Sequence, residues 1–324
     1  MSRTIRVGIP SLVGESLLKG FPEGVEIVRI DPDGTGPVEV EFLLAPWAQK
    51  HAEQVLPRAR GVQVVQSFSA GVEGLLPLLP HGVTFCNAQG LHNGPTAEWA
   101  VTAILASLKQ LPWYAGLQRE GRWVTRDEAA AHFNAIYRTD ERSELPVLIE
   151  ELAGKTVLIV GHGAIGRAIE TRLAPFEPNI LRIARSAREG VSPVSALPTL
   201  LPQADVVVLI IPLTPETRGL IDAAALARMK QGALLVNAAR GAVVDTDALV
   251  SALYESRIRA ALDVTDPEPL PPGHALWQAP GLLLTPHVAG SSPVFLKRVM
   301  DFTRAQVARY AEGQPLQNII VGAY

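Results

Sequence analysis

Short apolar runs separated by polar or turn-rich segments recur along most of the chain, a pattern typical of strands buried in parallel sheets. Five such runs in the first hundred residues predict strands at 5–9, 25–30, 40–44, 62–65 and 83–86. Six further runs after Lys155 predict strands at 156–160, 180–184, 206–211, 233–236, 260–264 and 282–285. Helix-length segments separate the runs, so the chain is predicted to be an α/β protein with two doubly wound parallel-sheet domains.

Helical spacing of apolar residues marks two further segments. The first predicts a long helix over 96–119, broken at Pro112, and the second predicts a helix over 294–311. Residues 122–150 are polar and charged without a strong period, so we predict an irregular surface excursion there.

Composition narrows the class of protein. The 324 residues carry 29 Lys and Arg against 32 Asp and Glu, a net charge of −3, so no basic field attracts nucleic acid or an anionic membrane. No apolar run reaches the roughly 18 residues of a membrane-spanning helix. The single cysteine, Cys86, excludes an internal disulfide and a cysteine-rich metal site. We therefore expect a cytoplasmic globular protein without a metal.

A glycine-rich segment follows the predicted strand at 156–160 and leads into a helical pattern. It reads Gly161-His162-Gly163-Ala164-Ile165-Gly166. In such a G-x-G-x-x-G segment, the first glycine permits a tight turn, the second lets the backbone approach a pyrophosphate, and the third lets the helix pack closely on the strand. The order of strand, glycines and helix predicts a dinucleotide-binding site.

The next predicted strand indicates which dinucleotide binds. An acidic residue about twenty positions beyond the fingerprint normally accepts hydrogen bonds from the ribose of NAD, but residues 179–188 contain no acid. Arg185 and Ser186 stand there and suit a 2′-phosphate. We predict NADP(H) in preference to NAD(H). Two alternatives stay open: Arg185 and Ser186 belong only to a solvated basic loop, or Glu189 swings back toward the site.

Three predicted strands are followed by residues suited to reducing a carbonyl beside a carboxylate. Arg240 can clamp a carboxylate with two parallel hydrogen bonds. His287 can supply a proton near neutral pH, and a buried carboxylate beside it would favour the imidazolium. Asp266 and Glu268 compete for that carboxylate role. Parallel strands bind ligands at their carboxyl edge, so we expect these residues to meet there.

Together these segments resemble the D-2-hydroxyacid dehydrogenase family and, within it, the glyoxylate/hydroxypyruvate reductases. The matching residues are the fingerprint, 212–217, 237–241, 262–264 with 268–271, and 286–290, in the family's order and spacing. The resemblance implies a flavodoxin-like substrate domain of residues 1–96 and 292–324, with a Rossmann domain of residues 97–291 inserted. It also implies a homodimer, which the aromatic stretch 111–123 supports unless those aromatics form a local core.

The resemblance assigns roles to the site. Arg240 would bind the substrate carboxylate and carbonyl, His287 would donate the proton, and Glu268 would be its partner. Ala70 and Gly71 would hold the substrate carboxylate through backbone amides, although Glu73 stands where the family often has aspartate. Asp263 would face the nicotinamide carboxamide. The full set of expected cofactor contacts is Thr96, Gly161, Gly163, Ala164, Ile165, Gly166, Arg185, Ser186, Pro212, Ala239 and Asp263.

We therefore expect an enzyme that reduces a small 2-oxo acid, such as glyoxylate or hydroxypyruvate, to the D-2-hydroxy acid. Two alternatives stay open. One is formate oxidation on the same scaffold, but related enzymes pair the histidine with glutamine, so Glu268 argues against it. The other is a nicotinamide-sensing corepressor that binds protein partners.

Overall fold

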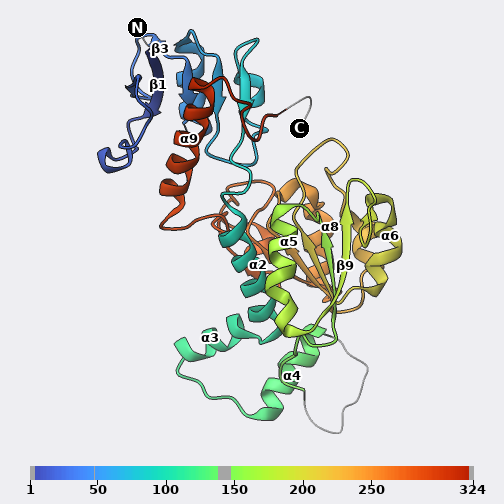
Figure 1. Ribbon diagram of the computed structural model, residues 1–324. Helices are drawn as coiled ribbons and strands as arrows, with labels where there is room; N and C mark the ends of the chain where they lie inside the picture. Colours follow the sequence, from blue (N-terminus) through green and yellow to red (C-terminus); the bar gives the residue numbers. More distant parts are fainter. Residues whose placement is uncertain (1–3, 47, 138–146, 321–324) are drawn as a thin grey trace. The chain divides into compact units, whose positions relative to one another are not determined.

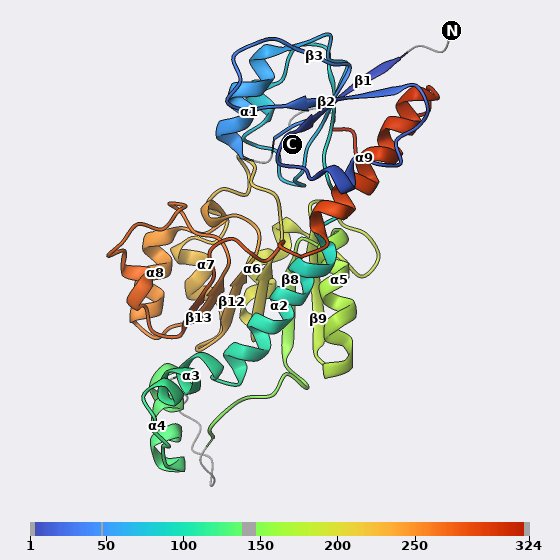
Figure 2. The same cartoon turned by 90° about the vertical axis from the view of Figure 1, so that its left-hand side faces the viewer.

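The computed structural model describes residues 4–46, 48–137 and 147–320. The chain divides into two compact units, Met1–His92 with Ser291–Tyr324, and Asn93–Gly290 (Figures 1 and 2). Each unit contains a parallel sheet covered by helices, which confirms the predicted α/β class.

The first unit contains a five-stranded parallel sheet in the order β2-β1-β4-β6-β7. Its strands are β1 (Ile5–Pro10), β2 (Val25–Ile30), β4 (Phe42–Leu44), β6 (Val64–Gln66) and β7 (Thr84–Cys86). Numbered within the sheet this is 2-1-3-4-5, the flavodoxin-like order. A separate two-stranded pair joins β3 (Val38–Glu39) to β5 (Ala59–Arg60).

Alternating side chains of these strands divide between the two faces of the sheet. Phe42 packs in one cluster with Val299 and Met300 of α9 (Phe295–Ala311), which lies along the sheet in Figure 1. The neighbouring Leu43 packs in another cluster with Val55 of α1 (Gln49–Val55). The two chain ends therefore build one core.

The second unit contains a seven-stranded parallel sheet in the order β10-β9-β8-β11-β12-β13-β14. The strands are β8 (Thr156–Val160), β9 (Asn179–Ala184), β10 (Ser192–Pro193), β11 (Val206–Leu209), β12 (Leu234–Asn237), β13 (Arg259–Leu262) and β14 (Leu282–Leu284). This is the doubly wound order of a dinucleotide-binding sheet, and the order reverses between β8 and β11. Ligands bind such sheets at that point.

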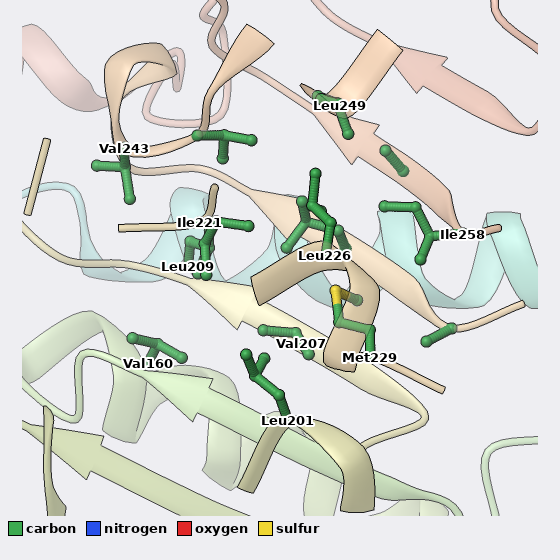
Figure 3. Packing of buried hydrophobic residues seen from close by; sticks show 14 of the residues in the cluster. Val160, Leu201, Val207, Leu209, Ile221, Leu226, Met229, Val243, Leu249 and Ile258 are labelled. Carbon is green, nitrogen blue, oxygen red and sulfur yellow. The ribbon is translucent and has the colours of Figure 1, made fainter. Parts of the chain in front are cut away.

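Helices cover both faces of this sheet. The helices α2 (Asn93–Leu108) and α5 (Ala164–Leu173) lie side by side on one face, and share a cluster with Ile159. The helices α6 (Leu197–Leu200), α7 (Ala223–Arg228) and α8 (Thr246–Tyr254) cover the other face. Figure 3 shows Val160, Val207 and Leu209 of the sheet among Leu201, Leu226 and Met229. Each such fully buried aliphatic side chain stabilises the fold by roughly 1.5–3 kcal/mol relative to an exposed one.

The predicted helix over 96–119 is two helices, and the break lies before Pro112. The first helix, α2, ends at Leu108, and Gln110, just before the second helix, is buried and has a left-handed φ of 56°. Pro112 lies in the first turn of α3 (Leu111–Arg119), where a missing N–H breaks no helical hydrogen bond. The proline therefore begins the second helix.

Residues 122–150 were predicted to be irregular, and this was wrong for 126–137, which form α4 (Arg126–Tyr137). The missed signal is a capping box. The Glu128 backbone N–H donates to Thr125 Oγ1 at 3.2 Å, and the Thr125 N–H donates to Glu128 Oε2 at 2.8 Å. Residues 138–146 lie outside the described residues.

Short 3₁₀ segments lie at Glu15–Leu17, Leu56–Arg58, Leu76–Leu78, Ala174–Phe176, Val194–Ala196, Leu201–Gln203, Gly241–Val243 and Ala275–Gln278. Within the part of the chain that the structure describes, no helix is both long and apolar enough to span a membrane.

Candidate active site

The glycine-rich turn after β8 leaves room for a ligand at one glycine only. A Cβ on Gly161 would lie 2.3 Å from the Ile210 carbonyl oxygen, and a Cβ on Gly166 would lie 2.3 Å from the Gly161 oxygen. Around Gly163 no atom lies within 4 Å of the position of a Cβ. Protein packing thus requires the first and third glycines, whereas the second borders open space at the start of α5. This arrangement fits a pyrophosphate, because the amides of a first helical turn lack partners within the helix.

Three adjacent strands bring the predicted catalytic segments to one edge. Asn237, Leu262 and Leu284 are register partners at the ends of β12, β13 and β14. Arg240 and His287 each follow three residues beyond this row. Neighbouring strands lie about 4.8 Å apart, so the ends of β12 and β14 lie within roughly 10 Å of each other, and both residues follow at the same edge of the sheet.

The Asn237 side chain shapes the turn that carries Arg240. Its Oδ1 accepts from the Ala239 N–H at 3.0 Å, and its Nδ2 donates to the Arg240 carbonyl at 2.9 Å. A Cβ on Gly241 would lie 2.0 Å from the Thr265 carbonyl oxygen, so this turn packs directly on the segment after β13. Arg240 is half-buried, and its Nη1 donates to the Ala239 carbonyl at 2.7 Å.

Asp263, which is 2% exposed, organises the loop that carries His287. Its carboxylate accepts from Thr285 Oγ1 at 2.6 Å and from the amides of Val288 and Ala289, both at 2.8 Å. Its carbonyl accepts from the His287 amide at 2.7 Å. The sequence reasoning missed this positioning role, because these bonds depend on the register of β13 and β14. The expected contact of Asp263 with a nicotinamide stays a prediction.

His287 pairs with Glu268 and not with Asp266. The distance from His287 Nδ1 to Glu268 Oε1 is 2.5 Å. His287 has a φ of 53°, a left-handed conformation that costs a non-glycine residue on the order of 1–3 kcal/mol. The expectation of a buried carboxylate was wrong, since the Glu268 side chain is 41% exposed and that of His287 is 47% exposed. Backbone carbonyls of the loop after β13 accept hydrogen bonds from two threonines: Asp266 from Thr246 at 2.8 Å and Pro267 from Thr265 at 2.8 Å.

The loop after β9 carries the residues expected to select the cofactor. Arg185 and Ser186 are both exposed and directly follow the strand. Arg188, which the sequence reasoning did not select, reaches back to the glycine turn and donates to the His162 carbonyl at 2.5 Å.

The other expected contacts lie in different settings. Thr96 is buried in α2, Ala239 is buried after β12, and Pro212 is exposed after β11. Ala70 and Gly71 belong to the other unit, in the loop after β6, where Asn87 Nδ2 donates to the Ala70 carbonyl at 2.8 Å. No group of three His, Cys, Asp or Glu side chains among residues 4–46, 48–137 and 147–320 is arranged to hold a metal ion.

Comparison with known proteins identifies the family. Residues 101–289 match the family described as D-isomer specific 2-hydroxyacid dehydrogenase, NAD binding domain. The chain belongs to the D-isomer specific 2-hydroxyacid dehydrogenase family. This confirms the resemblance, and the match covers the glycine turn and the segments of Arg240, Glu268 and His287.

Relatives extend the similarity over most of this dehydrogenase. A glyoxylate reductase of Thermofilum pendens is 33% identical over 85% of this chain and 79% of its own length. A glycerate dehydrogenase of Methylorubrum extorquens is 31% identical over 81% of this chain and 76% of its own. A solved NADPH-dependent glyoxylate/hydroxypyruvate reductase of Sinorhizobium meliloti, in complex with NADP and sulfate, is 26% identical with a TM-score of 0.79, and the alignment covers 98% of both chains.

Proposed function

We propose that this dehydrogenase reduces a small 2-oxo acid of the glyoxylate or hydroxypyruvate type to the D-2-hydroxy acid. The observation that carries the proposal is the His287–Glu268 pair, at the edge of the sheet where Arg240 also emerges. Relatives named glyoxylate reductase and glycerate dehydrogenase support this class of substrate. A glutamate beside the histidine argues against formate oxidation.

Three side chains have separate roles in the proposed reaction. When bound at the glycine-rich turn, a nicotinamide cofactor would supply the hydride that reduces the carbonyl carbon of the substrate. Arg240 holds the substrate carboxylate through two parallel N–H bonds and faces the carbonyl oxygen. His287 donates a proton to that oxygen from Nε2, because Nδ1 is bonded to Glu268. Glu268 fixes the orientation of the ring through its bond to Nδ1.

The cofactor proposed is NADP(H) in preference to NAD(H). Arg185 and Ser186 are exposed directly after β9, where an NAD enzyme of this fold normally has an acid. The proposed contacts are Thr96, Gly161, Gly163, Ala164, Ile165, Gly166, Arg185, Ser186, Pro212, Ala239 and Asp263. The kcat/KM with NADPH should exceed that with NADH, and Arg185→Ala should weaken NADPH by about tenfold or more while NADH changes little. Equal or better kcat/KM with NADH would refute the preference.

We also propose that the unit formed by the two chain ends binds the substrate. Its domain would comprise residues 1–96 and 292–324, with the cofactor domain at 97–291, and Ala70 and Gly71 would present backbone amides to the substrate carboxylate. We propose a cytoplasmic protein, in keeping with its single cysteine, Cys86, and a homodimer, as the family resemblance implies.

Steady-state turnover with a panel of 2-oxo acids tests the activity. Glyoxylate and hydroxypyruvate should be reduced with oxidation of NADPH, and pyruvate and phenylpyruvate test how large a side chain is accepted. Chiral analysis of the product should give the D isomer. A protein that binds NADPH and reduces no member of the panel would instead be a cofactor sensor, and the proposal would fail.

A further inference from the structure

Arg188 connects the two segments that flank the adenosine end of a dinucleotide site. It lies beyond β9, where its N–H and carbonyl pair with Val191 in a tight turn. Its Nη2 lies 3.2 Å from His162 Nδ1 and donates to the His162 carbonyl at 2.5 Å. His162 is the second residue of the glycine-rich turn, so one guanidinium joins the turn after β8 to the loop after β9.

These contacts define the tautomer of His162. Arginine stays protonated in proteins and can only donate, so His162 Nδ1 must accept. The ring proton is then on Nε2, which lies 2.6 Å from Glu170 Oε2 on α5. With the proton on Nε2 and the acceptor on Nδ1, the ring satisfies both neighbours at once.

Glu170 is itself held in place. Arg182 of β9 donates to it through Nε, at 3.0 and 3.1 Å from the two carboxylate oxygens, and also through Nη2. The Arg182 guanidinium, and to a smaller extent His162, hold the pKa of Glu170 below its usual value. The His162 side chain is only 10% exposed. A chain of hydrogen bonds from Arg182 through Glu170 thus holds the His162 ring, whose Nδ1 accepts from Arg188.

Arg188 keeps unused donors on its exposed side. Within residues 4–46, 48–137 and 147–320, the structure describes no partner for its Nε or Nη1. The loop after the second strand of such a sheet is where the ribose 2′ position is recognised. A guanidinium anchored through one nitrogen and open at the others suits a phosphate there, because less side-chain entropy is lost on binding.

We propose that Arg188 is a specificity-determining residue for the 2′-phosphate of NADP(H), and that His162 is the positioning residue that holds it. This inference rests on the proposed preference for NADP(H) and adds to Arg185 and Ser186. It assigns a purpose to a histidine inside the glycine-rich turn, a position that the fingerprint itself leaves unspecified.

Calorimetric binding of 2′,5′-ADP and 5′-AMP tests the inference without turnover. The measured quantity is the ratio of the two Kd values, which reports the 2′-phosphate alone. Arg188→Ala should reduce the preference for 2′,5′-ADP about tenfold. Arg167→Ala is the matched control, because Arg167 Nη1 also reaches the His162 carbonyl, at 3.5 Å, and its loss should leave the ratio within about twofold.

Two isosteric variants separate the two sides of the imidazole. His162→Asn retains an acceptor near the place of Nδ1 and should keep the preference. His162→Gln retains a donor near the place of Nε2, keeps the bond to Glu170, and should lower the preference about three- to tenfold. In the Arg188→Ala background His162→Gln should have no further effect on the ratio.

The outcomes are distinct. If the wild type binds 5′-AMP as tightly as 2′,5′-ADP, the proposed cofactor preference itself fails. If the wild type prefers 2′,5′-ADP and Arg188→Ala retains that preference, Arg185 and Ser186 suffice and the present inference is overturned. If His162→Asn loses as much preference as His162→Gln, His162 acts through Glu170 and does not position Arg188.

Discussion

At the scale of single residues, backbone hydrogen bonds position the candidate catalytic groups more than burial does. His287 and Glu268 are both substantially exposed, yet Asp263 binds the loop on either side of His287. Asn237 does the same for the turn that ends at Arg240. The loop of each candidate catalytic side chain is therefore held by a buried neighbour, Asp263 or Asn237.

Substitution of Arg240 tests its role in binding the substrate carboxylate. Arg240→Lys supplies a point charge where two parallel bonds are required, so it should not restore the activity lost in Arg240→Ala. Both variants should lose on the order of 3–5 kcal/mol in kcat/KM, about two to four powers of ten. The Kd for NADPH, followed by fluorescence, should change far less. Activity within about fivefold of wild type in both variants would make Arg240 a structural residue.

Substitution of Asp263 tests the support of the His287 loop. In Asp263→Asn one carboxylate oxygen becomes an NH₂ group that cannot accept from Val288 or Ala289. The free energy of unfolding should fall by about 1–3 kcal/mol, and kcat should fall with it. Asp266→Asn is the control, since Asp266 is exposed on the same loop, and it should change neither quantity measurably. Urea unfolding of the two variants decides between them; equal stability would contradict the positioning role of Asp263.

At the scale of elements, local capping explains the helix that hydrophobic periodicity did not reveal. The helix α4 buries Ala129, Ala130 and Phe133, but its charged first turn masks that apolar face in the sequence. Thr125 and Glu128 begin it, and hydrogen bonds from Thr125 hold the pKa of Glu128 below its usual value. A helix so capped should be sensitive to acid at its first turn.

Amide hydrogen exchange in α4 tests this sensitivity. Because the pKa of Glu128 is lowered in the folded state, its stabilisation is present above the usual carboxyl pKa of 4.5 and is lost as the pH falls through the folded value. Protection factors in the first turn should therefore drop at acid pH in the wild type. Glu128→Gln should already show low protection at pH 7 and little further pH dependence. Asp127→Asn, in the same turn, should keep the wild-type profile; an unchanged profile in Glu128→Gln would show that the cap contributes nothing.

At the scale of the whole molecule, each unit has a feature that the order of strands along the chain does not determine. The first unit needs α9 from the end of the chain to cover one face of its sheet. The second unit is continuous from Asn93 to Gly290 and places its order reversal beside the glycine turn. An inserted dinucleotide-binding unit is consistent with this division.

The aromatic residues in the stretch 111–123 bear on the oligomeric state of the protein. Trp113 stacks on His132, with ring centroids 3.9 Å apart, and also contacts Tyr114, so these two half-buried aromatics already have partners within the chain. Trp123 is 99% exposed. We expect light scattering to give twice the chain mass, and Trp123→Glu to shift it toward the monomer. Phe176→Glu, at another exposed aromatic, should leave the dimer intact, and a wild-type monomer at micromolar concentration would contradict the prediction.

The sequence by itself determined the two groups of buried strands, the glycine turn and the residues that follow β12, β13 and β14. Periodicity and motif order reveal these features because they depend on neighbours along the chain. The register confirmed that the segments of Arg240 and His287 reach one edge, as parallel strands require.

Only the tertiary structure decided which side chains meet. The decisive contacts join residues 19 to 26 positions apart. They are the pairing of Glu268 with His287, the bonds of Asp263 to the His287 loop, and the anchoring of Arg188 by His162. Such contacts depend on strand register and on the path of each loop, neither of which is encoded in local hydrophobicity. The left-handed turn at Gln110 likewise follows from packing, since no glycine marks it in the sequence.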